Sequence, residues 1–280
     1  MSITLPTLLK KQASGEKLTM LTAYDAGFAK LVDRAGIDMI LVGDSLGMVI
    51  QGHANTLPVT LEQILYHTAC VTRVVYNSFV IADMPFMSYQ ASVEEALRNA
   101  GRCLKESLAH AVKMEGGREL APTIKSAVDA GIPVMGHIGL RPQQIHKLGG
   151  YKIQGKTFSD AGLLQEEAVA LQEAGCFAIV LEGVAVETAA EITEALEIPT
   201  IGIASGPHCS GQVLVLHDLL GMDADFRPKH SKQFTDLSRI ITQAVQTYVA
   251  EVGQGIFPAE EHGTHRALIP LLCKEGTKGR

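Results

Sequence analysis

Apolar residues occur along the chain in eight short, nearly continuous runs, separated by longer segments whose apolar residues recur at helical spacing. Continuous apolar runs are typical of parallel strands that are covered on both faces. The expected strands are residues 18–23, 38–43, 78–83, 111–116, 132–139, 177–183, 198–204 and 212–218. Segments 92–107 and 159–175 are expected helices, the second capped by Ser159 or Asp160. The pattern therefore predicts eight βα units.

Three Ala-Gly pairs stand where an expected helix gives way to a strand, at Gly36, Gly131 and Gly175. Glycine adopts a positive φ without steric cost, which suits the end of a helix. Eight βα units match the usual length of a (β/α)₈ barrel, or TIM barrel, which is about 250 residues. A doubly wound open sheet shows the same alternation, and only pairing of the eighth strand with the first separates the two. We expect the barrel.

A single α/β domain is expected because no Pro/Ser-rich linker and no shift in composition divides the chain. The 280 residues are 46% hydrophobic, which is enough to build a large core. We assign residues 1–265 to the barrel domain, including the N-terminal segment and a final amphipathic helix over 234–252. Residues 266–280 are expected to form a tail, to which we assign no function.

The charge and cysteine patterns favour a small-molecule partner and the cytoplasm. The net charge is −6, and the basic residues are scattered, so the sequence offers no basic stripe for nucleic acid or for a membrane surface. The five cysteines are odd in number and contain no C-x-x-C pair, which argues against a disulfide framework or a thiolate zinc site. We also expect no secretory leader and no membrane-spanning segment.

Charged side chains stand at the ends of six of the expected strands, and the ends of parallel strands in a barrel share one face. These residues are Asp44, Asp83, Glu115, His137, Glu182 and Asp218. Any single carboxylate after a strand is equally well explained as the cap of the next helix. Because burying several ionised carboxylates together is costly, their convergence indicates a metal ion or a cationic substrate. The oxygen-rich set Asp44, Asp83 and Glu115 suits Mg²⁺ rather than zinc.

Four neighbouring side chains suggest further roles. Lys113 points to the same side of its strand as Glu115, so it needs either a protein carboxylate or a substrate carboxylate as its partner. Ser45 could donate a hydrogen bond to the same anion. Glu182 follows an apolar run that should raise its affinity for a proton, which makes it the candidate base. His137 is interpreted as a supporting donor, a substrate contact or a structural histidine.

Two further patterns are weak signals. Residues 150–157 fit the phosphate-loop pattern, but about ten polar residues separate them from the preceding strand, whereas a phosphate loop follows its strand directly. The histidines of HGTH, residues 262–265, have no other clustered ligands and are expected to be solvated.

Eight longer motifs occur in order along the chain. They are TAYD (22–25), LVGDSLGMVIQGHANTLPVT (41–60), ADMPFMSY (82–89), VKMEGG (112–117), GHIGLRPQ (136–143), GGYKIQGK (149–156), VLEG (180–183) and FPAEEH (257–262). Together they resemble the ketopantoate hydroxymethyltransferase family, from about residue 5 to residue 265. The resemblance implies a (β/α)₈ barrel, a homodecamer, and transfer of a hydroxymethyl group from 5,10-methylenetetrahydrofolate to 3-methyl-2-oxobutanoate for pantothenate synthesis.

The resemblance also implies residue roles. Residues matching Asp44, Asp83 and Glu115 surround Mg²⁺ in the family, those matching Ser45 and Lys113 bind the keto acid, and the one matching Glu182 accepts its proton. Other Mg²⁺-dependent 2-keto acid barrels, such as isocitrate lyase and phosphoenolpyruvate mutase, and a catalytically silent barrel are the alternatives.

The chain departs from the family pattern in two places. Ser107 and Leu108 replace a glycine-rich turn, and Ala204 occupies a glycine position where a positive φ or a close backbone approach is expected.

Overall fold

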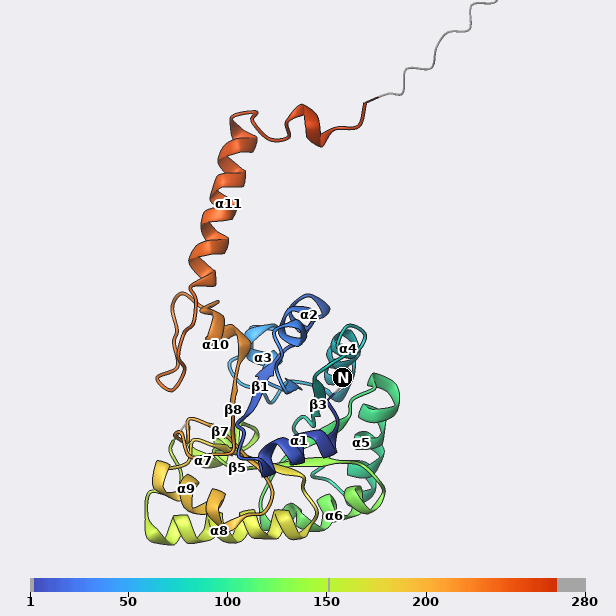
Figure 1. Cartoon of the computed structure of the whole chain (residues 1–280), viewed down its shortest axis with the longest axis vertical. Coiled ribbons are helices and arrows are strands. Elements are labelled where there is room, and N and C mark those ends of the chain that lie inside the picture. The colour runs from blue at the N-terminus through green and yellow to red at the C-terminus, as the bar shows by residue number, and fades with distance from the viewer. Residues whose placement is uncertain (1–2, 151, 266–280) are drawn as a thin grey trace, which may run out of the picture. The chain divides into compact units, whose positions relative to one another are not determined.

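The computed structural model describes residues 3–150 and 152–265. The chain forms two compact units, Met1–Thr235 and Asp236–Arg280. The first contains all eight strands and the second contains the long final helix (Figure 1). The domain boundary expected at residue 265 stays a prediction, because the proposed tail lies outside the described residues.

Eight parallel strands form a closed barrel in the order β1 to β8. Their bounds are β1 Leu18–Thr22, β2 Met39–Val42, β3 Phe79–Asp83, β4 Ala111–Glu115, β5 Val134–Gly139, β6 Ala178–Glu182, β7 Thr200–Ile203 and β8 Gly211–Leu214. Strand β8 pairs with β1 from Leu18↔Gly211 to Leu21↔Leu214. This pairing confirms the barrel and excludes the open sheet.

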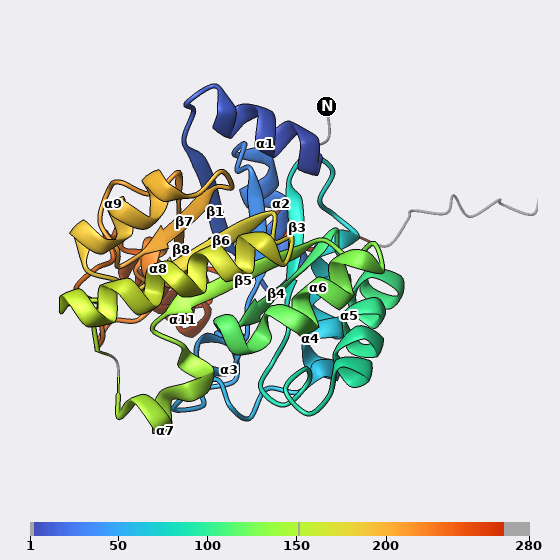
Figure 2. The same ribbon diagram turned by 90° about the horizontal axis from the view of Figure 1, so that it is seen from below.

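Helices connect the strands and surround the barrel (Figure 2). They are α1 Leu5–Ala13, α2 Ala26–Arg34, α3 Leu46–Val49, α4 Leu61–Thr72, α5 Val93–Ser107, α6 Ala121–Asp129, α7 Ile145–Leu148, α8 Phe158–Glu173, α9 Val186–Ala195 and α10 Leu216–Leu220, with short 3₁₀ turns η1 Arg118–Leu120 and η2 Pro142–Gln144. Helix α1 precedes the first strand and contributes Leu8 to the barrel's interior cluster. Lys11 of α1 donates to both oxygens of Asp38, at 2.7 and 2.8 Å, and so ties the helix to the start of β2.

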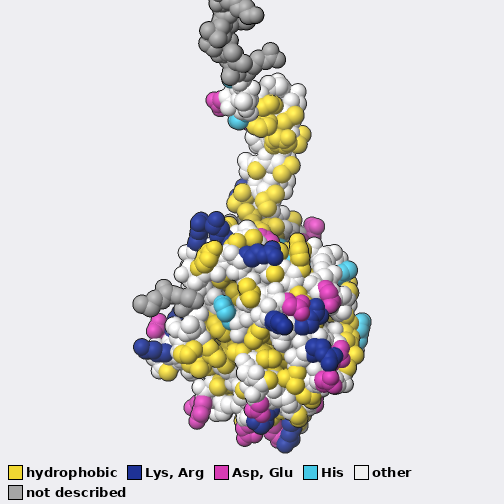
Figure 3. Space-filling model, turned by 90° about the vertical axis from the view of Figure 1, so that its right-hand side faces the viewer, with side chains coloured by type: hydrophobic (Ala, Val, Ile, Leu, Met, Phe, Trp, Pro, Cys, Tyr) yellow, Lys and Arg dark blue, Asp and Glu magenta, His cyan; other side chains and the backbone are white. Residues whose placement is uncertain are grey.

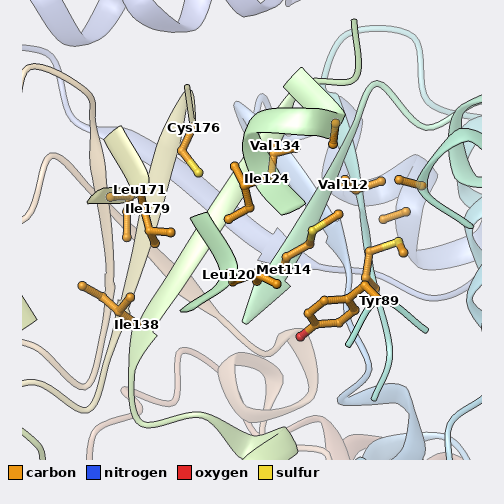
Figure 4. Packing of buried hydrophobic residues seen from close by; sticks show 14 of the residues in the cluster. Tyr89, Val112, Met114, Leu120, Ile124, Val134, Ile138, Leu171, Cys176 and Ile179 are labelled. Atoms are coloured by element: carbon orange, nitrogen blue, oxygen red, sulfur yellow. The ribbon is translucent and has the colours of Figure 1, made fainter. Parts of the chain in front are cut away.

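Alternation along each strand separates two hydrophobic layers. In β4, Val112 and Met114 belong to the layer between the strands and the helices, together with Ile124 of α6 and Leu171 of α8 (Figure 4). Ala111, which precedes Val112, belongs to a second cluster inside the barrel. Lys113 and Glu115, at the same parity as Ala111, therefore also face the interior. Strand β4 thus places apolar Ala111 in the barrel before Lys113 and Glu115 at its carboxyl end.

The Ala-Gly junctions behave as expected, because Gly36, Gly131 and Gly175 all have a positive φ of 86–95°. Two local predictions were wrong. Helix α8 is capped by Thr157, whose hydroxyl accepts from Asp160 N at 3.1 Å, rather than by Ser159 or Asp160. The eighth strand ends at Leu214 and not at residue 218, because helix α10 begins at Leu216.

The second unit contains helix α11, Leu237–Gly253, and the 3₁₀ turn η3, Glu260–His262. Asp236 caps α11 by accepting from Arg239 N at 3.1 Å. None of the residues of α11 is buried. Yellow, apolar atoms lie along this helix in Figure 3. Its exposed large apolar side chains are Ile240, Ile241, Val245, Tyr248, Val249 and Val252. Within residues 3–150 and 152–265, no helix combines the length and apolarity needed to cross a membrane.

Candidate active site

Five charged side chains meet at the carboxyl ends of neighbouring strands, inside the barrel. Register pairs Asp83 of β3 with Lys113 of β4, and Glu115 of β4 with His137 of β5. Glu182 ends β6, opposite Gly139 of β5. Gly139 has φ 92°, and a Cβ there would approach the Glu182 carbonyl oxygen to 2.4 Å, so the close pairing of these two strand ends requires glycine.

Asp44 and Ser45 join this group from the turn that follows β2. The backbone N–H of Asp44 donates to Asp83 Oδ2 at 3.1 Å. Ser45 begins the short helix α3, and its hydroxyl lies 2.8 Å from the hydroxyl of the buried Tyr24. A Cβ at Gly43 would lie 2.8 Å from Ser45 Oγ, so the glycine leaves room for this serine. The order Gly-Asp-Ser therefore places a carboxylate and a hydroxyl at the barrel mouth.

Lys113 lies between two buried carboxylates. Its Nζ is 2.6 Å from Asp83 Oδ1 and 3.5 Å from Glu115 Oε1, and all three residues are buried. Burial would lower the pKa of Lys113, but the Asp83 and Glu115 charges outweigh it and raise that pKa above its ordinary value. Lys113 therefore has protein carboxylates as partners. A lysine ammonium has three donors, so capacity remains for an anionic ligand.

His137 links Glu115 to Glu182. Its Nδ1 is 3.3 Å from Glu115 Oε1 and its Nε2 is 3.3 Å from Glu182 Oε2, although neither contact has hydrogen-bond geometry. Burial disfavours the charged imidazole, but the neighbouring carboxylates outweigh it and raise the pKa of His137 to about 9. Burial likewise opposes the charge on Glu115, yet His137 and Lys113 lower the pKa of Glu115 to about 2. Glu182 is the most accessible of the group, with 22% of its side chain exposed.

The two aspartates are held in an unfavourable electrostatic environment. Burial, and then repulsion by Asp83 and Glu115, raise the pKa of Asp44 well above its ordinary value. Burial also raises the pKa of Asp83, although Lys113 partly offsets it. When all three buried carboxylates are ionised, their charge exceeds that of the one lysine and the one protonated histidine beside them. Such a site attracts a cation.

The carboxylates suit a Mg²⁺ ion that takes only part of its coordination shell from the protein. They do not form a site in which protein side chains supply all the ligands. Among the described side chains, no group of three or more His, Cys, Asp and Glu is arranged to hold a metal ion. Mg²⁺ commonly takes one or two carboxylates and completes its shell with water and substrate oxygens. Both Glu115 oxygens already face protein donors, Lys113 and His137 on one side and the Gln143 N–H at 3.2 Å on the other. Both Asp83 oxygens are engaged in the same way, Oδ1 by Lys113 at 2.6 Å and Oδ2 by the Asp44 N–H at 3.1 Å, so these contacts do not rank Asp83 above Glu115 as a ligand.

Three sequence features lie outside this cluster. Asp218 is in the first turn of α10 rather than at a strand end, and it contacts none of the five charged groups. The phosphate-loop-like segment follows helix α7 instead of a strand, so its context differs from that of a phosphate loop. In HGTH, His262 Nδ1 accepts from Ala259 N at 3.0 Å, a local structural role.

Two residues with a clear place in the site were not recognised from the sequence. Tyr89 and Gln143 are buried beside the acidic cluster, and the tyrosine hydroxyl lies 2.7 Å from Gln143 Oε1. Tyr89 stands in a loop and Gln143 in the 3₁₀ turn η2, and neither is a charged residue at a strand end, so the strand-end pattern does not point to them. Tyr89 is among the buried side chains labelled in Figure 4.

A closed (β/α)₈ barrel with interacting acids, a lysine and a histidine at the carboxyl ends of its strands has the general organisation of barrel enzymes, whose active sites lie at that face. A sequence profile of the ketopantoate hydroxymethyltransferase family matches residues 2–260. The chain is 53% identical to 3-methyl-2-oxobutanoate hydroxymethyltransferase of Geobacter sulfurreducens, over 92% of this chain and 97% of the relative. The corresponding enzyme of Trichlorobacter lovleyi is 54% identical, over 93% and 97%. The chain belongs to the ketopantoate hydroxymethyltransferase family and is a transferase.

Solved structures with similar folds are more distant in sequence. Phosphonopyruvate hydrolase in complex with oxalate and Mg²⁺ gives a TM-score of 0.63 at 13% identity, covering 95% of this chain and 92% of the other. A 2,3-dimethylmalate lyase of the phosphoenolpyruvate mutase/isocitrate lyase superfamily gives 0.57 at 16%, covering 91% and 99%. These similarities confirm the fold alone. The family match sets aside the alternative assignment to those other keto acid barrels.

Proposed function

We propose that this enzyme transfers a one-carbon unit from 5,10-methylenetetrahydrofolate to 3-methyl-2-oxobutanoate, with Mg²⁺ as cofactor and Glu182 as the base. The observation that supports this most strongly is the continuous series of contacts from Asp83 through Lys113, Glu115 and His137 to Glu182. It places cation-attracting carboxylates, an ammonium and an accessible carboxylate in one site. The names of the relatives at 53–54% identity support the same reaction.

Each side chain has a distinct part in the proposed reaction. Asp44 and Asp83 hold Mg²⁺, with Glu115 completing the acidic wall around the ion. When bound, the ion supplies electrophilic stabilisation of the enolate oxygen. Lys113 and Ser45 bind the substrate carboxylate and so orient C3, a positioning contribution that can be worth several kcal/mol in rate.

Glu182 removes the C3 proton, and the C3 carbanion equivalent attacks the methylene carbon as one of its two C–N bonds to the folate breaks. Water displaces the second folate nitrogen to give the hydroxymethyl group, and the proton taken from C3 and one proton of the water end on the two nitrogens, so the products are 2-dehydropantoate and tetrahydrofolate. His137 lies against the Glu182 carboxylate at 3.3 Å and is placed to hold its orientation. Glu182 is the most exposed member of the charged group. This exposure is needed because a base must reach the substrate proton that it removes.

Exchange of the C3 proton tests substrate, ion and base without the folate. In D₂O, the wild-type enzyme should exchange the C3 proton of 3-methyl-2-oxobutanoate in a Mg²⁺-dependent manner. Glu182→Gln should keep Mg²⁺ and keto acid binding in calorimetry and lose at least about 100-fold in exchange. Glu187→Gln, in the exposed first turn of α9, is the matched control and should exchange normally. Unchanged exchange in Glu182→Gln would reject Glu182 as the base.

Two further measurements test the cosubstrate and the metal ligands. Formation of 2-dehydropantoate should require methylenetetrahydrofolate, whereas product formation without it would indicate a lyase or mutase reaction. Asp83→Ala should weaken Mg²⁺ binding, and an unaltered affinity would remove Asp83 from the metal site. The cytoplasmic location expected from the sequence remains a proposal.

We also propose that the chain forms a homo-oligomer, a homodecamer by its resemblance to the family. The apolar side chains displayed by α11 support an assembled state, since its own unit, which begins at Asp236, buries no residue of this helix. Sedimentation velocity of the full chain should give a decameric species. A stable monomer at micromolar concentration would contradict the proposal.

A further inference from the structure

Gln143 is a buried neutral side chain that contacts the acidic cluster directly. It lies in the 3₁₀ turn η2 after β5 and is 4% exposed. Its Nε2 donates to Asp44 Oδ2 at 3.0 Å and to the backbone oxygen of Met84 at 2.9 Å. Its Oε1 accepts from the Tyr89 hydroxyl at 2.7 Å and from Gln90 Nε2 at 3.1 Å. The side-chain amide thus donates two hydrogen bonds through Nε2 and accepts two through Oε1.

The orientation of the amide follows from these partners. A backbone carbonyl can only accept, so the atom beside Met84 O must be the amide nitrogen. The second N–H of that nitrogen then points at Asp44 Oδ2, which can accept only when it carries no proton. Tyr89 and Gln90 donate to the amide oxygen on the other side. The hydrogen bond from Gln143 Nε2 therefore holds the Asp44 carboxyl group in one rotamer.

The same residue reaches Glu115 through its backbone. Gln143 N donates to Glu115 Oε2 at 3.2 Å, and the Tyr89 hydroxyl accepts from Glu115 N at 3.0 Å. The turn that carries Gln143 is itself fixed, since the adjacent Arg141 pairs with Glu119 at 3.0 Å and with Glu167 at 2.5 Å. Gln143 thus connects the acids that follow β2 and β4 to one anchored turn after β5.

We propose that Gln143, held by Tyr89, is a positioning residue that prepares the acidic site for its divalent cation. This inference rests on the proposed function, because it concerns the same metal site. The neutral amide of Gln143 is suited to holding Asp44 in a cation-binding site. It fixes the Asp44 carboxylate while leaving its negative charge available, whereas a lysine or arginine in its place would neutralise the charge that attracts the ion.

Substitution of Gln143 should change metal affinity more than catalytic capacity. Gln143→Leu removes the donor to Asp44 at similar volume. Titration of the metal-free protein with MgCl₂ in a calorimeter should show at least a tenfold weaker affinity, equivalent to about 1.4 kcal/mol. In the C3 exchange assay, the half-saturating Mg²⁺ concentration should rise by a similar factor, with most of the rate recovered at saturation. A merely structural role would lower the melting temperature and leave that concentration unchanged.

Tyr89→Phe provides a second test that adds no volume. It deletes the hydroxyl that holds Gln143 Oε1, so a weaker shift in the same direction is expected. Gln144→Leu, one residue further along the same turn, is the matched control, since its backbone N–H bonds to Arg141 O and its side chain makes no hydrogen bond among the described residues. It should bind Mg²⁺ as the wild type does.

The outcomes separate this inference from the proposed function. If the wild-type protein binds no Mg²⁺, the proposed cofactor is wrong and the inference falls with it. If the wild type binds Mg²⁺ and both folded variants bind it equally well, the inference alone is overturned. Should Gln143→Leu fail to fold, the Tyr89→Phe result decides.

Discussion

Lys113 Nζ lies 2.6 Å from Asp83 Oδ1, and this buried ion pair engages one of the carboxylates proposed to hold Mg²⁺. The lysine has two effects in the metal-free protein. It compensates the charges of Asp83 and Glu115, and it competes with a divalent cation for them. Removing it should therefore have opposite effects on folding and on metal binding.

Lys113→Met should destabilise the metal-free protein by about 3–5 kcal/mol, because it leaves buried carboxylates without their partner. The same variant should bind Mg²⁺ more tightly and be stabilised by it more than the wild type is, since a ligand that binds only the folded state raises its stability. Melting temperature measured against MgCl₂ concentration tests both effects. Lys125→Met, which removes an exposed i,i+4 pair, is the control. An equal response to Mg²⁺ in Lys113→Met and wild type would contradict the competition.

Asp44→Asn should stabilise the metal-free protein while abolishing tight Mg²⁺ binding. The pKa of Asp44 is raised in the folded state, so its charged form costs stability above its ordinary pKa of 3.8. A neutral isostere removes this cost, and a rise in melting temperature of at least about 2 °C at pH 7 is expected. The gain should vanish below about pH 4, where the unfolded aspartate is also protonated. Asp129→Asn, on the surface, should shift the melting temperature by less than about 1 °C. A lower melting temperature for Asp44→Asn would show that its charge is compensated without metal.

Deprotonation of His137 should lower the free energy of unfolding of the metal-free protein at alkaline pH. Its folded-state pKa is raised to about 9 from an ordinary 6.5, so its protonation stabilises the fold fully below pH 6.5 and is lost as the pH rises through 9. The contribution amounts to about 3 kcal/mol at most. Urea unfolding of metal-free wild type and His137→Asn at pH 6 and pH 10 should show a difference between them that shrinks at the higher pH. His146→Asn, in an exposed position of α7, should show no such trend. A pH-independent difference would indicate that His137 is neutral.

The barrel and most of its charged site followed from local sequence patterns. Buried parallel strands require continuous apolar runs, and the ends of parallel strands share one face, so the polar residue that terminates each run marks the site. Asp83, Glu115 and Glu182 are found this way. Lys113 was recognised because strand alternation placed it beside Glu115.

Other features depend on contacts between distant segments. The apolar run before Asp218 reads as one strand, but the strand stops at Leu214. The N–H of Leu216 bonds to Thr22 Oγ1 of β1 at 2.9 Å, and helix α10 starts there. The proposed role of Gln143 similarly depends on its hydrogen bond to Asp44, which lies 99 residues earlier in the sequence and is brought next to Gln143 by the closed barrel. Neither contact leaves a periodic signal in the sequence.

Ala204 occupies the predicted glycine position with φ 54°, in the left-handed region. The following residue holds it there, because Ser205 Oγ donates to Leu181 O at 2.7 Å and accepts from Val184 N at 3.0 Å. A left-handed conformation costs an L-residue about 1–2 kcal/mol, and glycine avoids this cost while losing about 0.5–1 kcal/mol in chain entropy.

Ala204→Gly should therefore raise the free energy of unfolding by about 0.5–1 kcal/mol. Leu108→Gly should do likewise, since Leu108 ends α5 with φ 58° and its side chain is 66% exposed. Leu163→Gly, at an exposed position inside α8, is the matched control and should lower stability by about 1 kcal/mol. Urea unfolding of the three variants measures all of these effects. If Ala204→Gly were as destabilising as Leu163→Gly, the backbone at position 204 would not be strained, and the departure from the family pattern would carry no energetic cost.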